Sequence, residues 1–495
     1  MGLVNRRQFL GSVAAVGLAG AARPERATAR DAFSSYDAIG QAQLVRSKQA
    51  TALDLVDAAI ARIEAANPKL NAVVWEMFDN ARTRAKGALP DSPLSGVPYL
   101  IKDLDNVAGA RTTSGSRFVD SFPTANDPMP KKAIDAGLVI VGKTNTPEFG
   151  LLATTESLRL GPCRNPWNLD RSAGGSSGGA AAAVAAGLVP VAHASDGGGS
   201  IRIPASCCGV FGLKPSRGRM NLSRPMASDL SVQNCISRTV RDNAMVFSLS
   251  EDTGAHAPFK PIGFVSGPSK ARLRIAFGTA NYHDGTEPHP DVKAAVEASA
   301  KLCESLGHTI VPAQNPVHGQ AVVEAFVEAY MVAFSSWPAK LVQMAKKKNL
   351  KPENVFEPWT LGLAEYGMRA PPDAMSKALA VFRETEAKVD AFMASYDAWL
   401  TPVLALPPIR LGEQAPTLDF ATLFGRLAQY VLYTPIHNVA GTPAMSVPLG
   451  MSDDGLPIGS QFAAAKGRED LLYALAYELE AAQAWTRRTP KVWVG

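Results

Sequence analysis

Apolar residues in this chain recur with two different spacings, one typical of helices and one typical of short buried strands. Helical segments are expected at residues 37–67, 131–136, 180–186 and 291–306. Short apolar runs, which predict strands, lie at residues 96–103, 138–141 and 273–277. Because proline interrupts helices, we expect Pro68 to end the first helix. Helical and strand segments alternate, so the pattern predicts an α/β fold.

Length and composition are those of an ordinary globular protein. The chain has 495 residues, of which 46% are hydrophobic and 19% charged, and such a composition can bury a large core. Several average domains would fit this length, as would one large α/β domain. Proline and glycine are scattered evenly, and neither a linker nor an internal repeat follows residue 30. We therefore expect a single large domain over residues 30–495.

The first 29 residues have the features of a targeting segment. Asn5–Leu10 contains the adjacent pair Arg6 and Arg7 and resembles a twin-arginine export signal. An apolar stretch follows up to about Ala22, which is too short to span a bilayer comfortably. Ala27–Ala29 offers a cleavage site of small residues. We expect export to the periplasm; the alternative is a cytoplasmic protein with a basic tail.

The charge of the chain excludes some classes of partner. The net charge is +5, and the four arginines and one glutamate before residue 30 account for +3 of it, which leaves +2 for the remainder. That value is too small for a nucleic-acid-binding surface, and no basic stripe with interleaved aromatic residues is found. No other long apolar run follows the first segment, so we expect no membrane span in the mature protein.

The cysteines indicate neither disulfides nor a metal site. Their number is odd and their spacing matches no disulfide framework. One adjacent pair has no second pair to complete a zinc site. We expect all of them to be small buried hydrophobic residues, and we expect no metal and no cofactor. The five cysteines are Cys163, Cys207, Cys208, Cys235 and Cys303.

Two short motifs are misleading. Gly137–Thr144 fits the phosphate-binding pattern G-x4-G-K-[ST], but its four middle residues are Leu, Val, Ile and Val, which predict a strand rather than a flexible cradle. Gly175–Gly179 fits the G-x-S-x-G elbow of α/β-hydrolases, with Ser177 as nucleophile and His437 as one downstream partner. That interpretation leaves the rest of the region unexplained, so we set it aside.

The densest candidate chemistry lies between Arg171 and Arg219. Two loops rich in glycine place Ser176 and Ser200 24 residues apart, and one helix of small residues joins them. A single Gly-Ser loop is usually a plain turn. Two such loops around one buried helix, each with a serine among glycines, favour a shared site.

This segment resembles the amidase signature, and the likeness extends over nearly the whole chain after residue 30. Further segments typical of that family are Gly96–Pro98, Lys102–Asp103, Gly142–Glu148, Arg164–Asn168, Asn438–Ala444 and Gly455–Gly459. The resemblance implies one amidase domain over residues 30–495, with a mixed central sheet covered by helices. It also implies a hydrolase that cleaves a small-molecule carboxylic amide.

The resemblance assigns a catalytic triad. Ser200 is the nucleophile that forms an acyl-ester with the substrate. Ser176, which in the family follows a cis peptide bond, relays the proton, and Lys102 is the base. A lysine has an ordinary pKa near 10.4, so Lys102 must be desolvated before it can accept a proton at neutral pH. Its apolar strand can supply that burial, and we expect an alkaline activity optimum.

The resemblance also assigns supporting residues. The backbone N–H groups of Gly197, Gly198, Gly199 and Ser200 are expected to form the oxyanion hole. The segment that ends at Gly150 is expected to contact the substrate.

Asp196 and Arg202 are expected to pair and to brace the oxyanion loop. The chain departs from the family at two nearby positions. Ser195 stands where threonine is usual and keeps the hydroxyl, whereas Gly197 stands where a larger residue is usual and is expected to loosen the loop. His193, just before the loop, is expected to be a structural residue.

The sequence indicates the class of amide substrate less clearly than it indicates the catalytic residues. Within the family, several motifs are most similar to hydrolases that open a cyclic amide of 6-aminohexanoate; aryl, fatty and peptide amides are the alternatives. Residues 315–430 are the candidate pocket segment, and their aromatic residues fit either a pocket or the core. These residues are Phe326, Tyr330, Phe334, Trp337, Trp359, Tyr366 and Phe382.

Two other functional classes are alternatives to an amide hydrolase. An amidase-like subunit of a tRNA-dependent amidotransferase conflicts with the export signal and with the weak charge. A non-catalytic binding protein conflicts with the intact triad of Lys102, Ser176 and Ser200. The oligomeric state is left open by the sequence, with a homodimer as one option.

Overall fold

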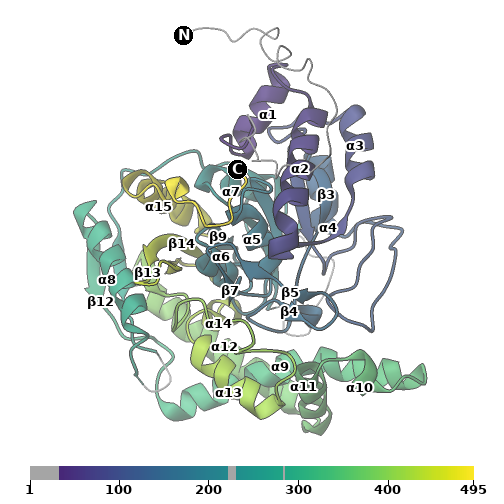
Figure 1. Ribbon diagram of the computed structural model, residues 1–495. Helices are drawn as coiled ribbons and strands as arrows, with labels where there is room; N and C mark the ends of the chain where they lie inside the picture. Colours follow the sequence, from purple (N-terminus) through teal and green to yellow (C-terminus); the bar gives the residue numbers. More distant parts are fainter. Residues whose placement is uncertain (1–32, 221–229, 282–284) are drawn as a thin grey trace.

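The computed structural model describes residues 33–220, 230–281 and 285–495 (Figure 1). The export signal predicted for residues 1–29 lies outside the described residues. Within the described ranges, no helix combines the length and the apolar character that a bilayer crossing requires.

One mixed sheet forms the centre of the molecule, and eleven strands of the described chain take part in it. In spatial order the strands are β1 (Val73–Glu76), β3 (Val139–Thr144), β2 (Pro98–Lys102), β8 (Val191–Asp196), β10 (Val232–Ser237), β9 (Phe211–Lys214), β14 (Ala444–Met451), β15 (Pro457–Ala463), β13 (Ala398–Pro402), β11 (Arg274–Phe277) and β12 (Thr309–Pro312). Two short ladders lie beside it: β4 (Glu156–Ser157) with β5 (Gly161–Pro162), and β6 (Arg164–Asn165) with β7 (Asn168–Ser172).

Strand direction in this sheet determines where the site forms. β2 pairs in parallel with both β3 and β8, and Leu100 of β2 lies opposite Ala192 of β8. All three strands are buried along their whole length, as is typical of parallel strands covered on both faces. Parallel strands end at the same edge of a sheet, so the ends of β2 and β8 lie together.

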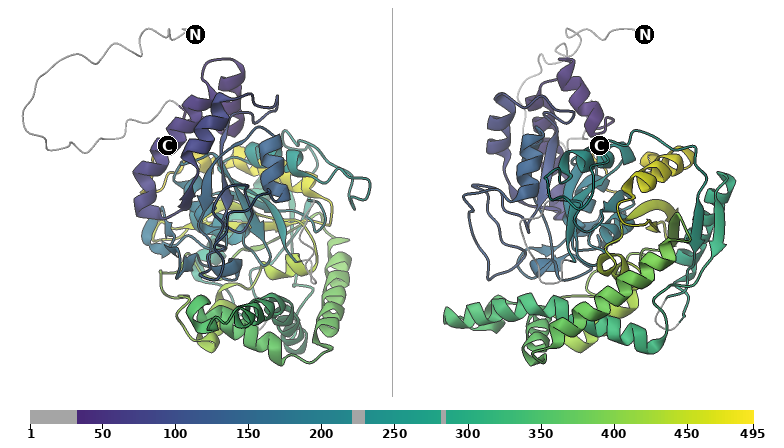
Figure 2. Two further views of the ribbon diagram at one scale, coloured as in Figure 1. Left: turned by 90° about the vertical axis from the view of Figure 1, so that its right-hand side faces the viewer. Right: turned by 180° about the vertical axis from the view of Figure 1, so that it is seen from behind.

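Helices surround the sheet, as Figures 1 and 2 show. The helices up to residue 305 are α1 (Ala38–Arg46), α2 (Ala52–Leu70), α3 (Phe78–Lys86), α4 (Pro128–Asp135), α5 (Gly178–Ala185), α6 (Arg202–Cys208), α7 (Val240–Ser250) and α8 (Pro290–Ser305). Those after residue 305 are α9 (Gln320–Lys347), α10 (Pro352–Val355), α11 (Pro358–Arg369), α12 (Ala374–Met393), α13 (Phe420–Tyr430), α14 (Pro435–Val439) and α15 (Glu469–Ala482). α9, α11, α12 and α13 gather below the sheet in the view of Figure 1.

The predicted α/β fold with a mixed central sheet is confirmed, and the predicted short strands correspond to β2, β3 and β11. The first predicted helix was wrong in two respects. The chain turns at Lys48, which has a φ of 57°, and a capping box of Thr51 and Asp54 starts a second helix. Pro68 does not end that helix, which runs on to Leu70. Pro68 has no N–H to donate to Glu64, yet the helix continues past it, and the N–H of Asn71 still donates to the carbonyl of Asn67.

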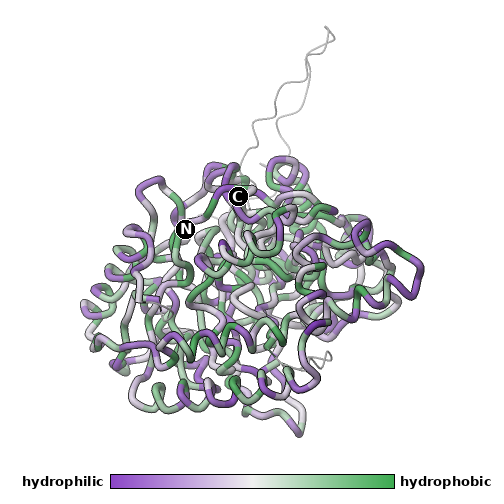
Figure 3. Tube along the Cα trace, turned by 90° about the horizontal axis from the view of Figure 1, so that it is seen from below, coloured by the Kyte–Doolittle hydropathy of each residue, from purple (hydrophilic) through white to green (hydrophobic). Residues whose placement is uncertain are grey.

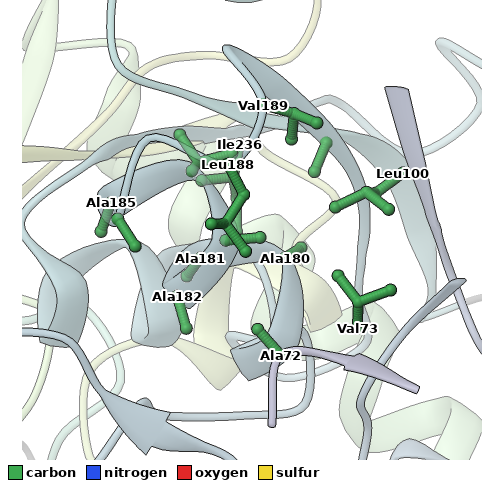
Figure 4. Packing of buried hydrophobic residues seen from close by; sticks show 14 of the residues in the cluster. Ala72, Val73, Leu100, Ala180, Ala181, Ala182, Ala185, Leu188, Val189 and Ile236 are labelled. Atoms are coloured by element: carbon green, nitrogen blue, oxygen red, sulfur yellow. The ribbon is translucent and has the colours of Figure 1, made fainter. Parts of the chain in front are cut away.

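The helix of small residues, α5, lies at the heart of the main hydrophobic cluster (Figure 4). Ala180, Ala181 and Ala182 are fully buried. A Cβ on Gly179 would lie 2.4 Å from the backbone nitrogen of Asn145, so the absence of a side chain lets the backbones approach closely. All five cysteines are buried and unpaired, as the sequence predicted.

The peripheral helices alternate between hydrophobic and hydrophilic residues along their length, which Figure 3 shows as alternating green and purple. This alternation is the expected pattern for a helix that packs one face on a core and exposes the other.

Candidate active site

The shared edge of β2 and β8 brings one lysine beside two serine hydroxyls. Lys102, the last residue of β2, is completely buried. Its Nζ lies 2.6 Å from Oγ of Ser176 and 3.1 Å from Oγ of Ser195, which belongs to β8. The structure therefore brings together two of the three predicted catalytic side chains, Lys102 and Ser176.

Burial changes the acidity of this lysine. Loss of hydration lowers the pKa of Lys102 to about 7, while the carboxylates of Asp105 and Asp196 act in the opposite direction. An amine with such a pKa is substantially neutral near neutral pH. Lys102 can therefore accept a proton, as a general base must.

An ion pair fixes the chain next to the lysine. Lys143 of β3 lies 2.8 Å from Oδ1 of Asp103, and both side chains are fully buried. Asp103 also accepts hydrogen bonds from the N–H and hydroxyl of Thr113, and Lys143 donates to Thr112. Lys143 is the lysine of the segment Gly137–Thr144, which fits the phosphate-binding pattern. It lies on the buried strand β3 and bonds to internal partners, which agrees with the prediction of a strand rather than a phosphate-binding loop.

His193 of β8 also supports the end of β2. Its Nδ1 accepts from the backbone N–H of Lys102 at 3.3 Å, and its Nε2 lies 3.3 Å from Oε1 of Gln233. The imidazole is buried and bonded on both nitrogens, which fits the structural role expected for it.

The loop before α5 holds Ser176 against this lysine. The peptide bond between Gly175 and Ser176 is cis, as the family resemblance implied. A Cβ on Gly175 would lie 2.5 Å from the carbonyl oxygen of Thr154, so only glycine fits there. Gly150 is close to the same serine, because a Cβ on Gly150 would lie 3.2 Å from Ser176 Oγ.

Ser200 lies on the neighbouring loop, two residues before α6. The backbone N–H of Ser177 donates to the carbonyl oxygen of Ser200 at 3.3 Å, so the two serine loops are in direct contact. The Ser177 hydroxyl itself donates to the carbonyl of Ser195 at 3.3 Å. Ser177 is thus bonded within the scaffold.

A buried ion pair braces the second loop, and it joins Asp196 and Arg202 as the sequence predicted. Arg202 Nε donates to Oδ2 and Nη2 to Oδ1 of Asp196, both at 2.9 Å, and both side chains are fully buried. Burial alone would raise the pKa of Asp196, but the Arg202 guanidinium and then Lys214 hold that pKa well below its ordinary value. The carboxylate therefore stays ionised.

Residues from the C-terminal third complete the surroundings of this pair. Arg202 also donates to the carbonyl of Thr434, to Gln461 Oε1 and to Asn438 Oδ1, at 2.7 to 2.9 Å. Asn438 in turn donates to both the carbonyl and Oδ1 of Asp196. Every polar group of the buried pair thereby has a partner, which is the condition for such a pair to be tolerated.

The glycine loop itself is held at three points. The N–H of Gly199, one of the four expected oxyanion donors, donates to Asp196 Oδ1 at 2.7 Å. The hydroxyl of Thr434 donates to the carbonyl of Gly198 at 2.7 Å, and the hydroxyl of Tyr330 donates to the carbonyl of Gly197 at 3.0 Å. The loop is therefore bonded in place despite its glycine content.

The aromatic residues of the segment 315–430 separate into different environments. Three of them, Phe326, Tyr330 and Phe334, stack along α9 toward the glycine loop. Trp359 is buried and donates to the carbonyl of Leu151 at 3.0 Å. Trp337, by contrast, has 51% of its surface exposed.

The rival hydrolase elbow receives no support from the position of its histidine. His437 is buried, and its Nδ1 lies 3.0 Å from Oγ1 of Thr442. Burial, followed by the charges of Arg202 and Lys214, lowers the pKa of this imidazole well below its ordinary value. A histidine in that environment stays neutral, and its ring packs edge-on against that of Trp399.

The amidase family model matches residues 54–473 of the chain. The chain belongs to the amidase family. It is a hydrolase that acts on carbon–nitrogen bonds, as the family resemblance implied.

Relatives cover almost the whole amidase. A Mycobacterium bovis protein assigned as an amidase, AmiC, is 40% identical over 462 residues, with 92% of this chain and 96% of the relative covered. The 6-aminohexanoate-cyclic-dimer hydrolase of Paenarthrobacter ureafaciens is 36% identical over 484 residues, with 92% and 96% covered. A solved structure of 6-aminohexanoate cyclic dimer hydrolase with substrate has a TM-score of 0.85 at 34% identity and covers 93% of this chain and 99% of that chain.

Several contacts in this amidase could not be identified from the sequence. Thr434, which bonds to the loop, and Gln461, which bonds to Arg202, carry no sequence signal, because each contact joins residues more than 200 positions apart. In the sequence, Asn438 is part of a motif typical of the family and Tyr330 is one aromatic residue among several, so neither is marked as a contact of this site. Among the described residues, no group of three His, Cys, Asp or Glu side chains is arranged to hold a metal ion.

Proposed function

We propose that this amidase hydrolyses a carboxylic amide through an acyl-enzyme on Ser200, with Ser176 as proton relay and Lys102 as base. The observation that carries the proposal is the 2.6 Å contact between Lys102 Nζ and Ser176 Oγ, made by a fully buried lysine with a pKa of about 7. A buried neutral amine next to a hydroxyl is the arrangement that proton abstraction requires.

In the first half of the reaction, Ser200 Oγ attacks the amide carbon and forms a carbon–oxygen bond. The Ser200 proton passes to Ser176 Oγ, whose own proton passes to Lys102 Nζ. The carbon–nitrogen bond then breaks, and the leaving amine takes a proton back along the same path. This half leaves an ester on Ser200 and a neutral lysine.

The negative oxygen of the tetrahedral intermediate needs hydrogen-bond donors. Gly199 donates to Asp196, so we assign the oxyanion to the N–H groups of Gly197, Gly198 and Ser200, with Gly199 as an anchor of the loop. The Asp196–Arg202 pair keeps that loop in one conformation.

In the second half, a water molecule attacks the ester carbon. Its proton passes to Lys102 through Ser176, and the ester bond to Ser200 then breaks. Ser200 recovers its proton by the same relay, and the acid product leaves. We propose that the substrate passes Gly150, because a Cβ there would lie only 3.2 Å from Ser176 Oγ and would narrow the space around that hydroxyl.

For the substrate we propose a cyclic or short oligomeric amide of 6-aminohexanoate. The support is the similarity to a hydrolase of that cyclic dimer over 92% of this chain. A panel of cyclic dimer, anilides, fatty amides and peptide amides tests the proposal with purified enzyme. Cleavage of the cyclic dimer well above the others supports it, and a preference for any other class contradicts it.

Labelling with a fluorophosphonate probe tests the catalytic assignment. We expect wild-type enzyme to be labelled, Ser200→Ala to lose the label, and Lys102→Met to be labelled far more slowly. Ser177→Ala is the matched control, because Ser177 is the nucleophile of the rival elbow and should keep the label on Ser200. Persistent labelling of Ser200→Ala would contradict the assignment.

We also propose that residues 1–29 direct export of the amidase domain, residues 30–495, by the twin-arginine route. Unpaired, buried cysteines are compatible with folding before export. Fractionation of cells and sequencing of the mature N-terminus test this, with Arg6→Lys/Arg7→Lys as the variant expected to stay in the cytoplasm.

Size-exclusion chromatography of the mature enzyme decides between monomer and homodimer.

A further inference from the structure

Two successive carbonyl groups of the glycine loop are held by hydroxyls from distant parts of the chain. Tyr330, on α9, donates to the carbonyl of Gly197 at 3.0 Å. Thr434, just before α14, donates to the carbonyl of Gly198 at 2.7 Å. Both bonds fix the orientation of a peptide group, because a hydroxyl donor restricts the direction of the oxygen that accepts it.

In a trans peptide the carbonyl and the following N–H lie in one plane and point in opposite directions. The peptide between Gly198 and Gly199 shows the relation: its carbonyl accepts from Thr434, and its N–H donates to Asp196. On the preceding peptide, Tyr330 holds the carbonyl of Gly197. The N–H of Gly198 is therefore turned away from the Tyr330 hydroxyl.

We propose that Tyr330 is a positioning residue of the oxyanion hole, whose hydroxyl aims the N–H of Gly198 at the oxyanion of the reacting amide. The inference rests on the proposed function, because it takes this loop as the oxyanion hole. It also gives α9, which lies in the segment expected to decide specificity, a direct connection to the catalytic donors.

The close packing around Gly198 supports a fixed position of the Tyr330 hydroxyl relative to this glycine. A Cβ on Gly198 would lie only 2.0 Å from Oη of Tyr330, so the hydroxyl occupies the space that a side chain would need. The Tyr330 ring is itself held between two others. Its centroid lies 4.5 Å from that of Phe334 and 6.2 Å from that of Phe326, with interplanar angles of 20° and 19°.

Tyr330→Phe removes the hydroxyl and keeps the stacked ring. Loss of one oxyanion donor costs about 100- to 1,000-fold in kcat, and a donor that is misaligned rather than removed should cost less, about tenfold. We expect that fall in kcat with KM changed less than about twofold. Tyr477→Phe is the matched control. Tyr477 lies on α15, and its hydroxyl donates to the carbonyl of Val265 at 2.9 Å. Loss of this hydroxyl should leave kcat unchanged.

A transition-state ligand separates positioning from a general structural effect. A trifluoromethyl ketone forms a tetrahedral oxyanion on Ser200, whereas the corresponding alcohol cannot. We expect Tyr330→Phe to bind the ketone about tenfold more weakly and the alcohol as well as wild type does. Complete labelling with a fluorophosphonate counts the active sites, so a misfolded fraction does not affect the comparison.

A double variant tests the steric relation. Gly198→Ala should be severely impaired, because its Cβ would collide with the Tyr330 hydroxyl. Combination with Tyr330→Phe should restore part of the activity, because the nearest ring atom would then be 3.3 Å away. A double variant no more active than the product of the single losses would contradict the inference.

Two further outcomes overturn the inference and leave the proposed function standing. One is a Tyr330→Phe enzyme with wild-type kcat and ketone affinity; the other is an equal loss of affinity for ketone and alcohol. Labelling that persists in Ser200→Ala would instead overturn the proposed function itself.

Discussion

The hydroxyl of Ser195 lies 3.1 Å from Nζ of Lys102, which also lies 2.6 Å from the hydroxyl of Ser176. Ser195 stands on β8, whose parallel pairing with β2 makes the contact possible. The amine thereby contacts two hydroxyls, and Ser195, unlike Ser176, has no part in the proposed proton relay.

Removal of this second hydroxyl should reduce activity without abolishing it. We expect Ser195→Ala to lower kcat about tenfold, because the Lys102 side chain loses one of two bonds that orient it. Ser195→Thr keeps the hydroxyl and should retain most of the activity. Steady-state kinetics of both variants check this, and equal kcat for alanine and wild type would show that Ser176 alone orients the lysine.

The pH profile should follow the titration of Lys102. The proposed mechanism needs the neutral amine, and the pKa of Lys102 is about 7, so kcat/KM should be level above pH 8 and should fall as pH drops through 7. At pH 5 a decrease of about a hundredfold is expected from single-proton titration. The alkaline optimum predicted from sequence thus becomes a plateau that begins near neutral pH. A flat profile down to pH 5 would exclude Lys102 as the base.

Stability should depend on pH through the same group. Lys102 has a pKa of about 7 in the folded chain and 10.5 as its ordinary value. Between these values the unfolded chain binds a proton that the folded chain does not, so wild type loses stability as pH falls from about 10.5 to 7, by about 1.4 kcal/mol per unit.

The variant Lys102→Met lacks this titration. The free energy of unfolding of this variant, minus that of wild type, should therefore rise steadily as the pH is lowered from 9.5 to 7.5. Urea unfolding at three pH values measures the difference. Lys214, whose pKa burial also lowers to about 7, contributes equally to both proteins and cancels. A difference that does not change with pH would show that Lys102 is already protonated in the folded state.

The Asp196–Arg202 pair should contribute strongly to stability. Arg202→Met leaves the Asp196 carboxylate buried without its main cation, and breaking such a pair costs about 3–5 kcal/mol. Arg82→Met is the matched control, because the Arg82–Asp57 pair is exposed at 39% and 48% and should leave stability unchanged within error. Urea unfolding of both variants measures the effects, and similar small losses would contradict the bracing role.

Local sequence was enough to predict the segments that carry the proposed site. The apolar run that ends at Lys102, the two glycine loops and the helix of small residues are each read from neighbouring positions, and the structure places them as expected. The Asp196–Arg202 pair was also predictable, because only six positions separate the two residues. The end of the first helix was misjudged, because capping at Thr51 and tolerance of Pro68 in a last turn depend on details finer than hydrophobic spacing.

The distant groups that hold the glycine loop could not be predicted from local sequence. Tyr330 and Thr434 lie 133 and 236 positions from the carbonyls that accept from them, and no local pattern encodes such contacts. Strand pairing and helix packing determine these contacts, because a hydrogen bond needs its two atoms within about 3 Å whatever their separation along the chain. Neighbouring residues therefore supply the glycine N–H groups of the loop, and the packing of α9 and α14 sets the direction in which its peptide groups point.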